Sequence, residues 1–204
     1  MIPSINPPTN EDIEVLCCFC RNLPKNCIVL ETGAGDSTEH IAKSIKPLGG
    51  KLYTIDASIK EDKEKDNIVC ISGWSVSYKD LPKPTDPDFV KSKYKDCVDH
   101  EMVFLGKEYM PGKTDMIRET VKKIGPNFDM FFCDTGEYCG LPEFRILEEL
   151  NFVKIGGFFA AHDIYYPKSV KNYRTLKILK KSDKWKILKQ TKTQQGLVIA
   201  ERLK

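Results

Sequence analysis

The sequence predicts an α/β fold built around a mostly parallel sheet. The first observation is an apolar run at 27–30 that ends in an acid and leads into a turn with two glycines, followed by a helical pattern. The second is another apolar run, at 51–55, that also ends in an acid. The third is that later apolar runs, at 128–133 and 156–161, end in polar residues too. Polar residues at the carboxyl ends of strands are typical of parallel sheets that bind a ligand at that edge.

Length and composition agree with a single domain. The chain has 204 residues, of which 41% are hydrophobic and 30% are charged. These values are ordinary for a globular protein with one core. We therefore expect residues 1–204 to form one domain.

A lead-in helix is expected over residues 10–22. Thr9 and Asp12 have the spacing of a capping box, and Ile13 and Leu16 follow at helical spacing. We expect this helix to pack outside the first strand.

The first strand is expected at 27–30, with Glu31 at its carboxyl end. Gly33 and Gly35 follow, and glycines at this place let the backbone turn tightly and approach a ligand that a Cβ atom would obstruct. A strand-to-helix turn can also need glycine when no ligand binds, and this alternative stays open.

The residues after the glycines predict a helix. Asp36, Ser37 and Thr38 are candidate caps, and Ile41 and Ile45 are its inward positions. The unit is thus a strand, a glycine turn and a helix.

The chemistry of this turn indicates the kind of ligand. Asp56 ends the second strand at a distance along the chain that suits hydrogen bonds to ribose hydroxyls. Thr38 stands where a dinucleotide fingerprint would have its third glycine, and the carboxylate of Glu31 disfavours phosphate. A ligand with a ribose, a positive charge and no phosphate fits better, and S-adenosylmethionine has this description.

The order of these motifs resembles the class I S-adenosylmethionine-dependent methyltransferases. Within them the chain is most similar to small-molecule O-methyltransferases, including the catechol and macrocin types. The residues that carry the resemblance are Glu31, Gly33, Gly35, Asp56, the strand 128–133 with Asp134, and the strand 156–161 with His162 and Asp163.

The resemblance implies a Rossmann-like, doubly wound sheet of seven strands, mostly parallel, that closes with an antiparallel hairpin. The stretches 185–191 and 196–203 fit that hairpin. It also implies S-adenosylmethionine as the cofactor. The residues expected to bind it are Glu31, Gly33, Gly35, Ser37, Asp56, Gly106, Lys107 and Asp134.

The middle of the chain leaves the third strand open. We expect it at Met102–Gly106, because this choice leaves a connection of normal helix length before residue 128. The alternative register uses Ile71, Gly73 and Trp74 instead. Residues 72–100 contain aromatic residues, prolines and mixed charge without a clean helical pattern. We expect an insertion there that covers the site or contacts a partner subunit.

The chemistry is expected where Asp134, His162 and Asp163 meet at the carboxyl ends of neighbouring strands. His162 and Asp134 are the candidate catalytic groups, since histidine has a suitable ordinary pKa for a base. By the resemblance, Asp134, His162 and Asp163 are also candidate ligands of a divalent metal. A histidine among them favours manganese, iron or zinc over magnesium, or no metal at all. A purely structural role for His162 and Asp163 is the alternative.

One departure from the family concerns the base. The lysine that the family places after the fourth strand is absent, since the chain continues Thr135-Gly136-Glu137-Tyr138. This departure keeps open a catalytically silent or hydroxylase-like member of the fold. A nicotinamide-dependent dehydrogenase is another alternative, which the position of Glu31 and the terminal hairpin disfavour. Methylation of a nitrogen is disfavoured because the Asn-Pro-Pro-Tyr type of signature is missing.

Charge and cysteine content limit the partners. The net charge of +3 is too small to predict a nucleic-acid partner, and the lysines between Lys168 and Lys189 are expected to form a solvated face. The cysteines fall mostly inside predicted elements, as buried thiols do, and no long apolar run predicts a membrane span.

We expect a cytoplasmic enzyme that methylates a hydroxyl of a small molecule. A homo-oligomer that forms through the insertion at 72–100 is a hypothesis.

Overall fold

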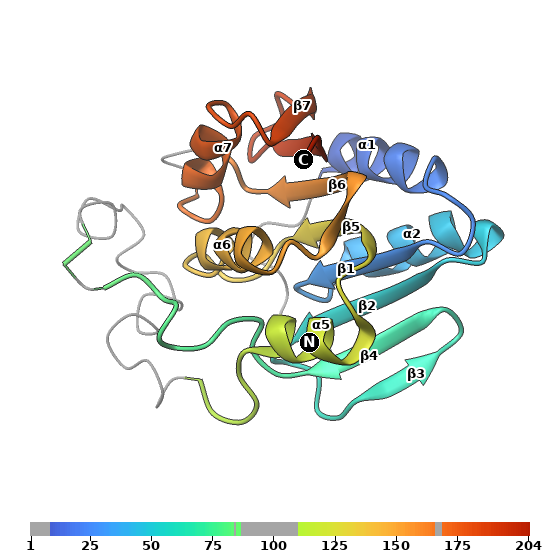
Figure 1. Cartoon of the computed structure of the whole chain (residues 1–204). Helices are drawn as coiled ribbons and strands as arrows, with labels where there is room; N and C mark the ends of the chain where they lie inside the picture. Colours follow the sequence, from blue (N-terminus) through green and yellow to red (C-terminus); the bar gives the residue numbers. More distant parts are fainter. Residues whose placement is uncertain (1–8, 84, 87–109, 166–168) are drawn as a thin grey trace.

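The computed structural model describes residues 9–83, 85–86, 110–165 and 169–204 (Figure 1). Its centre is an eight-stranded sheet with the strand order β3-β4-β2-β1-β5-β6-β8-β7. The strands are β1 (Ile28–Thr32), β2 (Lys51–Asp56), β3 (Lys63–Lys65), β4 (Ile68–Ser72), β5 (Phe128–Cys133), β6 (Val153–His162), β7 (Trp185–Gln190) and β8 (Leu197–Arg202).

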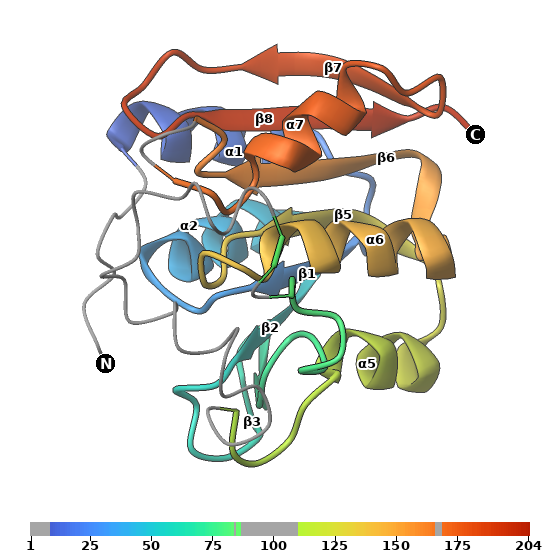
Figure 2. The ribbon, with the colours of Figure 1, turned by 90° about the vertical axis from the view of Figure 1, so that its left-hand side faces the viewer.

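Helices cover both faces of the sheet. Figures 1 and 2 show α1 and α2 on one face and α5, α6 and α7 on the other. The helices are α1 (Asn10–Arg21), α2 (Asp36–Ile45), the short 3-10 helix η1 (Lys46–Leu48), α5 (Met116–Ile124), α6 (Gly140–Leu150) and α7 (Tyr173–Leu179). The predicted doubly wound α/β class is therefore confirmed, and so is the lead-in helix.

The sheet is parallel through its middle and antiparallel at its edges. Strands β4, β2, β1, β5 and β6 run parallel to their neighbours, whereas β8 is antiparallel to β6, and β7 is antiparallel to β8. The closing hairpin was predicted. The eighth strand, β3, was not: it is a short exposed strand, antiparallel to β4, in a charged stretch without apolar alternation.

The predicted third strand is wrong, and the alternative register holds. Ile68–Ser72 pairs in parallel with β2, with Ile71 opposite Ile55. The prediction relied on the length of the connection to β5, but the apolar, mostly β-branched residues of β4 occupy the place beside β2. The expected strand Met102–Gly106, and Lys107 after it, lie outside the described residues. So does most of the predicted insertion at 72–100.

The core consists of two layers, one on each face of the sheet. Strand β5 is buried at every position, and its side chains alternate between the layers. One layer contains Phe131, Phe144, Phe159 and Trp185 beneath α6, with ring centroids 5.0–6.2 Å apart. Burying each such ring contributes roughly 1.5–3 kcal/mol. This packing holds the carboxyl ends of β5 and β6 side by side.

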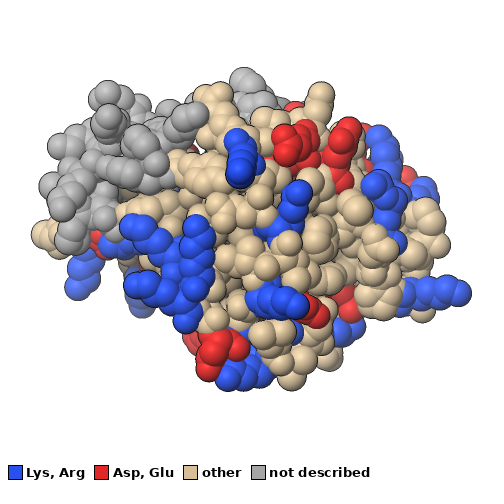
Figure 3. All heavy atoms as spheres, turned by 90° about the horizontal axis from the view of Figure 1, so that it is seen from above, with Lys and Arg blue, Asp and Glu red and all other residues tan. Residues whose placement is uncertain are grey.

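The lysines near the C-terminus are mostly exposed, as predicted. Lys177, Lys180, Lys184, Lys186 and Lys189 are exposed on α7, the following turn and β7. In the view from above, Lys and Arg side chains are spread over this face with acidic side chains among them (Figure 3). None of the described helices is both long enough and apolar enough to span a bilayer.

Candidate functional site

The polar residues of the site meet at the carboxyl edge of the parallel strands. The chain passes from β1 to β2 and β4 on one side and returns to β5 on the other, so β1 and β5 flank the point where the strand order reverses. Ligands of such sheets bind at that point. Gly33 follows β1 there, and Asp134 follows β5.

Gly33 has a structural reason to be glycine. Its φ is +88°, and a Cβ atom there would lie 2.2 Å from the carbonyl oxygen of Asp134. At Gly33 the backbone therefore lies close to the residue that follows β5. This agrees with the alternative reading, in which the turn needs glycine although no ligand binds there. Gly35 differs, since a Cβ atom there would have no heavy atom of the described residues within 4 Å. Open space at Gly35 suits the approach of a ligand.

Glu31 is fully buried beneath this turn. The hydroxyls of Ser37 and Thr38 each donate to one of its carboxylate oxygens, at 2.7 Å. Burial raises the pKa of Glu31 to about 7, against the opposing effect of these hydrogen bonds. The carboxyl group orders the turn from below. Its predicted contact with a cofactor stays a prediction.

Of the caps predicted for α2, Thr38 is confirmed, whereas Asp36 and Ser37 are not. Gly35 is the N-cap residue, and the hydroxyls of Ser37 and Thr38 donate to Glu31. The hydroxyl of Thr38 also accepts from the backbone N–H of Gly35 at 3.0 Å. Glu31 is buried and close in sequence, so both hydroxyls donate to its carboxylate.

Asp56 lies at the end of β2, as predicted, and is partly exposed. Its carboxylate accepts from the backbone N–H of Ala34 at 2.9 Å and from that of Ser58 at 2.6 Å. Asp56 thus ties the glycine turn to the second strand. Carboxylate oxygens have further lone pairs, which remain suited to ribose hydroxyls.

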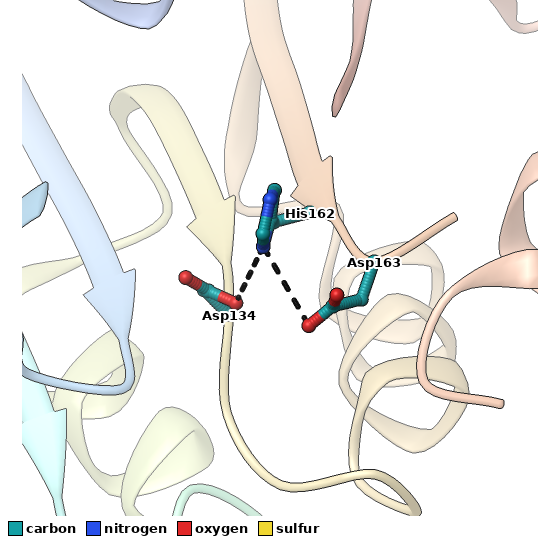
Figure 4. A group of neighbouring side chains, drawn as sticks. All are labelled: Asp134, His162 and Asp163. Carbon is teal, nitrogen blue, oxygen red and sulfur yellow. Dashed lines mark ion pairs between the residues drawn. The ribbon is translucent and has the colours of Figure 1, made fainter. Parts of the chain in front are cut away.

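The structure brings Asp134, His162 and Asp163 together, as the sequence predicted. Nδ1 of His162 lies 3.5 Å from Oδ1 of Asp134 and 3.5 Å from Oδ2 of Asp163 (Figure 4). These distances are too long for good hydrogen bonds, so the attraction is mainly between charges. Asp134 is the most exposed of the three, with 12% of its side chain accessible, while His162 is fully buried.

Asp12 of α1 completes the surroundings of His162, and sequence reasoning missed it. Its carboxylate lies 3.7 Å from Nε2 of His162 and accepts from the hydroxyls of Thr191 and Thr193. Burial by itself would raise the pKa of Asp12, but these partners hold it well below its usual value. The only sequence signal was a capping acid at the start of a helix, and that signal indicated nothing about the site.

The carboxylates around His162 favour its charged form. Burial alone would lower its pKa, but Asp12, Asp134 and Asp163 together raise it to about 11. An imidazolium cannot accept a proton, so this geometry speaks against His162 as the general base. Asp134 remains as the partly exposed acceptor.

Lys171 is the second residue that sequence reasoning missed. It belongs to the lysine-rich stretch that was expected to be solvated, yet only 8% of it is exposed. Its Nζ lies 2.9 Å from Oδ1 of Asp134 and 2.7 Å from Oδ2 of Asp163. Burial alone would lower the pKa of Lys171, but the two carboxylates hold it well above its usual value.

The backbone around Lys171 explains how it enters the site. Asp163 has a φ of +59°, a conformation that Asp tolerates better than most residues, and it turns the chain out of β6. Asn172 then donates from its amide to the carbonyl oxygen of His162 at 2.8 Å, and its backbone N–H donates to that of Asp163 at 3.2 Å. Asn172 is buried and fastens the residue beside it to the strand end.

A cavity of about 640 Å³ borders this cluster. Lys171 and Glu137 line it, together with residues 79–83 and 85–86, Arg118 of α5, one side of α6 and the start of α7. Glu137 accepts from the hydroxyl of Ser169 at 2.7 Å, and burial raises its pKa. Neither the glycine turn nor Asp134 is among the residues that line this cavity.

A divalent metal does not fit the cluster in this arrangement. The ligand atoms of Asp134, His162 and Asp163 lie within 4.8 Å of one another, which is the spacing of a metal site. Both carboxylate groups, however, already hold the ammonium of Lys171. His162 also presents a positive charge to them. A metal would have to displace Lys171.

Comparisons with known proteins connect this arrangement to one class of fold. No protein-family model and no curated protein matches the sequence. Among solved structures, MycE, a methyltransferase of mycinamycin biosynthesis in complex with Mg, S-adenosylhomocysteine (SAH) and mycinamycin VI, aligns over 88% of this chain at 17% identity with a TM-score of 0.53. The chain spans 45% of the length of MycE.

Two other structures match over most of their own length. The O-methyltransferase TomG from Streptomyces achromogenes, involved in tomaymycin synthesis and bound to S-adenosylmethionine, aligns over 97% of this chain and 82% of its own, at 17% identity and a TM-score of 0.55. An rRNA methylase from Streptococcus thermophilus aligns over 98% and 99%, at 14% identity and a TM-score of 0.51. The chain therefore has the fold of the S-adenosylmethionine-dependent methyltransferases, as the resemblance implied.

Proposed function

We propose that this chain is an S-adenosylmethionine-dependent methyltransferase that acts on a hydroxyl group of a small molecule. The observation that carries the proposal is the meeting of Gly33, Gly35 and Asp56 with Asp134 at the reversal point of the strand order. The fold shared with MycE and TomG supports it, since their structures contain SAH and S-adenosylmethionine.

In this proposal the cofactor lies over the glycine turn. Asp56 would accept from the ribose hydroxyls, and the open space at Gly35 would admit the methionine part. The turn has no lysine or arginine between Glu31 and Thr38, which agrees with a ligand that carries a positive sulfonium and no phosphate. Gly106 and Lys107 were predicted as adenine contacts because they follow the strand expected at Met102–Gly106, and they lie outside the described residues. Since β4 takes the place of that strand beside β2, the adenine would instead lie near Gly73 and Trp74, which follow β4.

The chemistry is one displacement. The acceptor oxygen attacks the methyl carbon, a C–O bond forms, and the C–S bond breaks with its electron pair staying on sulfur. The proton of the hydroxyl must leave, and Asp134, which contacts the cavity-lining Lys171 and is partly exposed, would accept it. Alignment of the two reactants supplies the larger part of the acceleration.

The cofactor is tested by calorimetric titration with SAH. Asp56→Asn keeps an acceptor oxygen for the backbone N–H of Ala34 but removes the charge, and we expect it to weaken binding about tenfold or more. Asp183→Asn is the matched control, because Asp183 is exposed near the closing hairpin and pairs with Lys204. If wild type binds no SAH, the methyltransferase proposal fails. Binding of a nicotinamide cofactor would favour the dehydrogenase alternative instead.

The acceptor class is tested next, with radiolabelled S-adenosylmethionine. Phenols, sugars and macrolide-type hydroxyls form one panel, and ribosomal RNA forms the other, because the likeness to the rRNA methylase is similar in extent. Label in a small molecule would support the proposal. Label in RNA alone would replace it with the nucleic-acid alternative, and SAH binding without any transfer would favour a silent member of the fold.

A further inference from the structure

The cluster at the ends of β5 and β6 contains its own cation. The ammonium of Lys171 lies between the carboxylates of Asp134 and Asp163, at 2.9 Å and 2.7 Å. These two acids, with His162, are the described residues whose spacing would suit a metal ion. A carboxylate pair that converges on one point is a site for a positive charge, and here a side chain supplies that charge.

We propose that Lys171 takes the place of a divalent metal in this site, and that its ammonium binds and orients the acceptor oxygen during methyl transfer. The part about the acceptor rests on the proposed function. The part about the metal does not, because it concerns only the occupancy of the carboxylate pair.

Distances and charges support the exclusion of a metal. A divalent ion would bind carboxylate oxygens at roughly 2.0–2.6 Å, on the same Oδ1 of Asp134 and Oδ2 of Asp163 that contact Lys171. It would then lie within a few ångströms of an ammonium. Three carboxylates, from Asp12, Asp134 and Asp163, face the two cationic side chains Lys171 and His162. The charges are therefore nearly balanced before any ion enters.

The position of Lys171 also gives it access to the acceptor. An ammonium has three N–H donors, and two of them are directed to Asp134 and Asp163. Lys171 and Glu137 are both among the residues that line the 640 Å³ cavity. In this proposal the remaining donor of the ammonium meets a ligand oxygen there. An ammonium held in this way stabilises the negative charge that develops on the acceptor oxygen as its proton leaves.

A lysine used only as a structural ion pair would not need to face the cavity. The two carboxylates come from different strands, and Asn172 fixes the backbone beside Lys171 to His162. Lys171 is thus rigidly held at the border between the cavity and Asp134. This is the place at which a metal would hold an acceptor oxygen, and the ammonium offers a donor for the same purpose.

The first test measures metal binding and needs no enzymatic activity. The probe is Mn²⁺, titrated into the SAH-saturated protein and followed by electron paramagnetic resonance. Lys171→Gln removes the charge but keeps an amide donor, Lys171→Ala empties the position, and Lys180→Ala removes an exposed lysine of the same region as a control. We expect no site in wild type or Lys180→Ala, and binding at least about tenfold tighter in Lys171→Ala or Lys171→Gln.

Wild-type binding of Mn²⁺ that Asp134→Asn abolishes would overturn the proposal, because the ion would then displace Lys171. The proposal would also be overturned if Mn²⁺ bound neither to wild type nor to folded Lys171 variants, since Asp134 and Asp163 would then not form a cation site. If a Lys171 variant folds only in the presence of Mn²⁺, as measured by circular dichroism, the result supports the proposal. SAH affinity, measured in the same samples, separates these outcomes from a failure of the proposed function.

The second test uses an acceptor found in the screen. We expect transfer by wild type to be unchanged by EDTA, and Lys171→Gln to lose at least about a hundredfold in kcat with SAH affinity changed less than about threefold. A merely structural lysine would alter stability and SAH binding together and leave kcat of the folded fraction unchanged. Inhibition of wild type by EDTA that Mg²⁺ reverses would contradict the proposal.

Discussion

The Nζ atom of Lys171 lies 2.7 Å from Oδ2 of Asp163, and both side chains are almost completely buried. This ion pair joins the end of β6 to the segment that leads into α7. Its second carboxylate, Asp134, comes from β5. The pair therefore connects the two strands that carry the candidate chemistry, and several consequences can be measured.

The first prediction concerns the stability that depends on Lys171. Removing one partner of a buried ion pair leaves an uncompensated charge, so Lys171→Ala should lower the free energy of unfolding by roughly 3–5 kcal/mol. Urea denaturation followed by circular dichroism measures it. Lys180→Ala, on an exposed lysine, should change the value by less than about 0.5 kcal/mol. Equal effects of the two substitutions would show that the pair contributes little.

A second prediction concerns the buried acid Glu31. Its folded-state pKa is raised to about 7. A carboxyl group with a raised pKa stabilises the fold fully below its unfolded pKa, and this contribution is lost as the pH rises through the folded pKa. Between pH 4.5 and 7.5 wild type should lose roughly 3 kcal/mol that Glu31→Gln does not lose. Urea titrations at several pH values test this, with Glu39→Gln on the exposed face of α2 as control. Parallel curves for wild type and Glu31→Gln would contradict it.

His162 gives a third prediction, in a different pH window. Its pKa is raised to about 11 by three carboxylates. The stability from its positive charge is complete below pH 6.5 and is lost as the pH rises through about 11. In an NMR titration its imidazole signals, assigned by comparison with His162→Gln, should stay in the protonated position from pH 5 to 9. A midpoint near 6.5 would mean that the carboxylates do not hold the charge, and would restore His162 as a candidate base.

The two glycines of the turn provide a matched pair for a fourth prediction. Gly33→Ala forces a Cβ atom to within 2.2 Å of the Asp134 carbonyl at a φ of +88°, and should cost roughly 2–4 kcal/mol of stability. Gly35→Ala meets open space and extended backbone, so stability should change by less than about 1 kcal/mol. SAH titration of the stable Gly35→Ala variant should nevertheless show weaker binding. Unchanged affinity would indicate that the cofactor does not approach there.

Local sequence patterns determined much of the architecture. The apolar runs that became β1, β2, β5 and β6, and the hairpin of β7 and β8, were predicted because buried parallel strands and hairpins have distinct patterns over few residues. The same patterns placed Asp134, His162 and Asp163 at one edge. Parallel strands that are neighbours in a sheet end at the same edge, so their meeting follows from topology.

Only the tertiary structure decided which neighbours those residues have. Asp12 reaches His162 from α1, and Lys171 enters from a stretch whose other lysines are exposed. Nothing local distinguishes Lys171 from those lysines, because burial of a charge depends on carboxylates that come from distant strands. The identity of the third strand also depended on long-range packing, because pairing with β2 selected the register that contains Ile71. The sequence by itself thus determined the elements and the edge at which the site forms, whereas the balance of charges within the site depended on long-range packing.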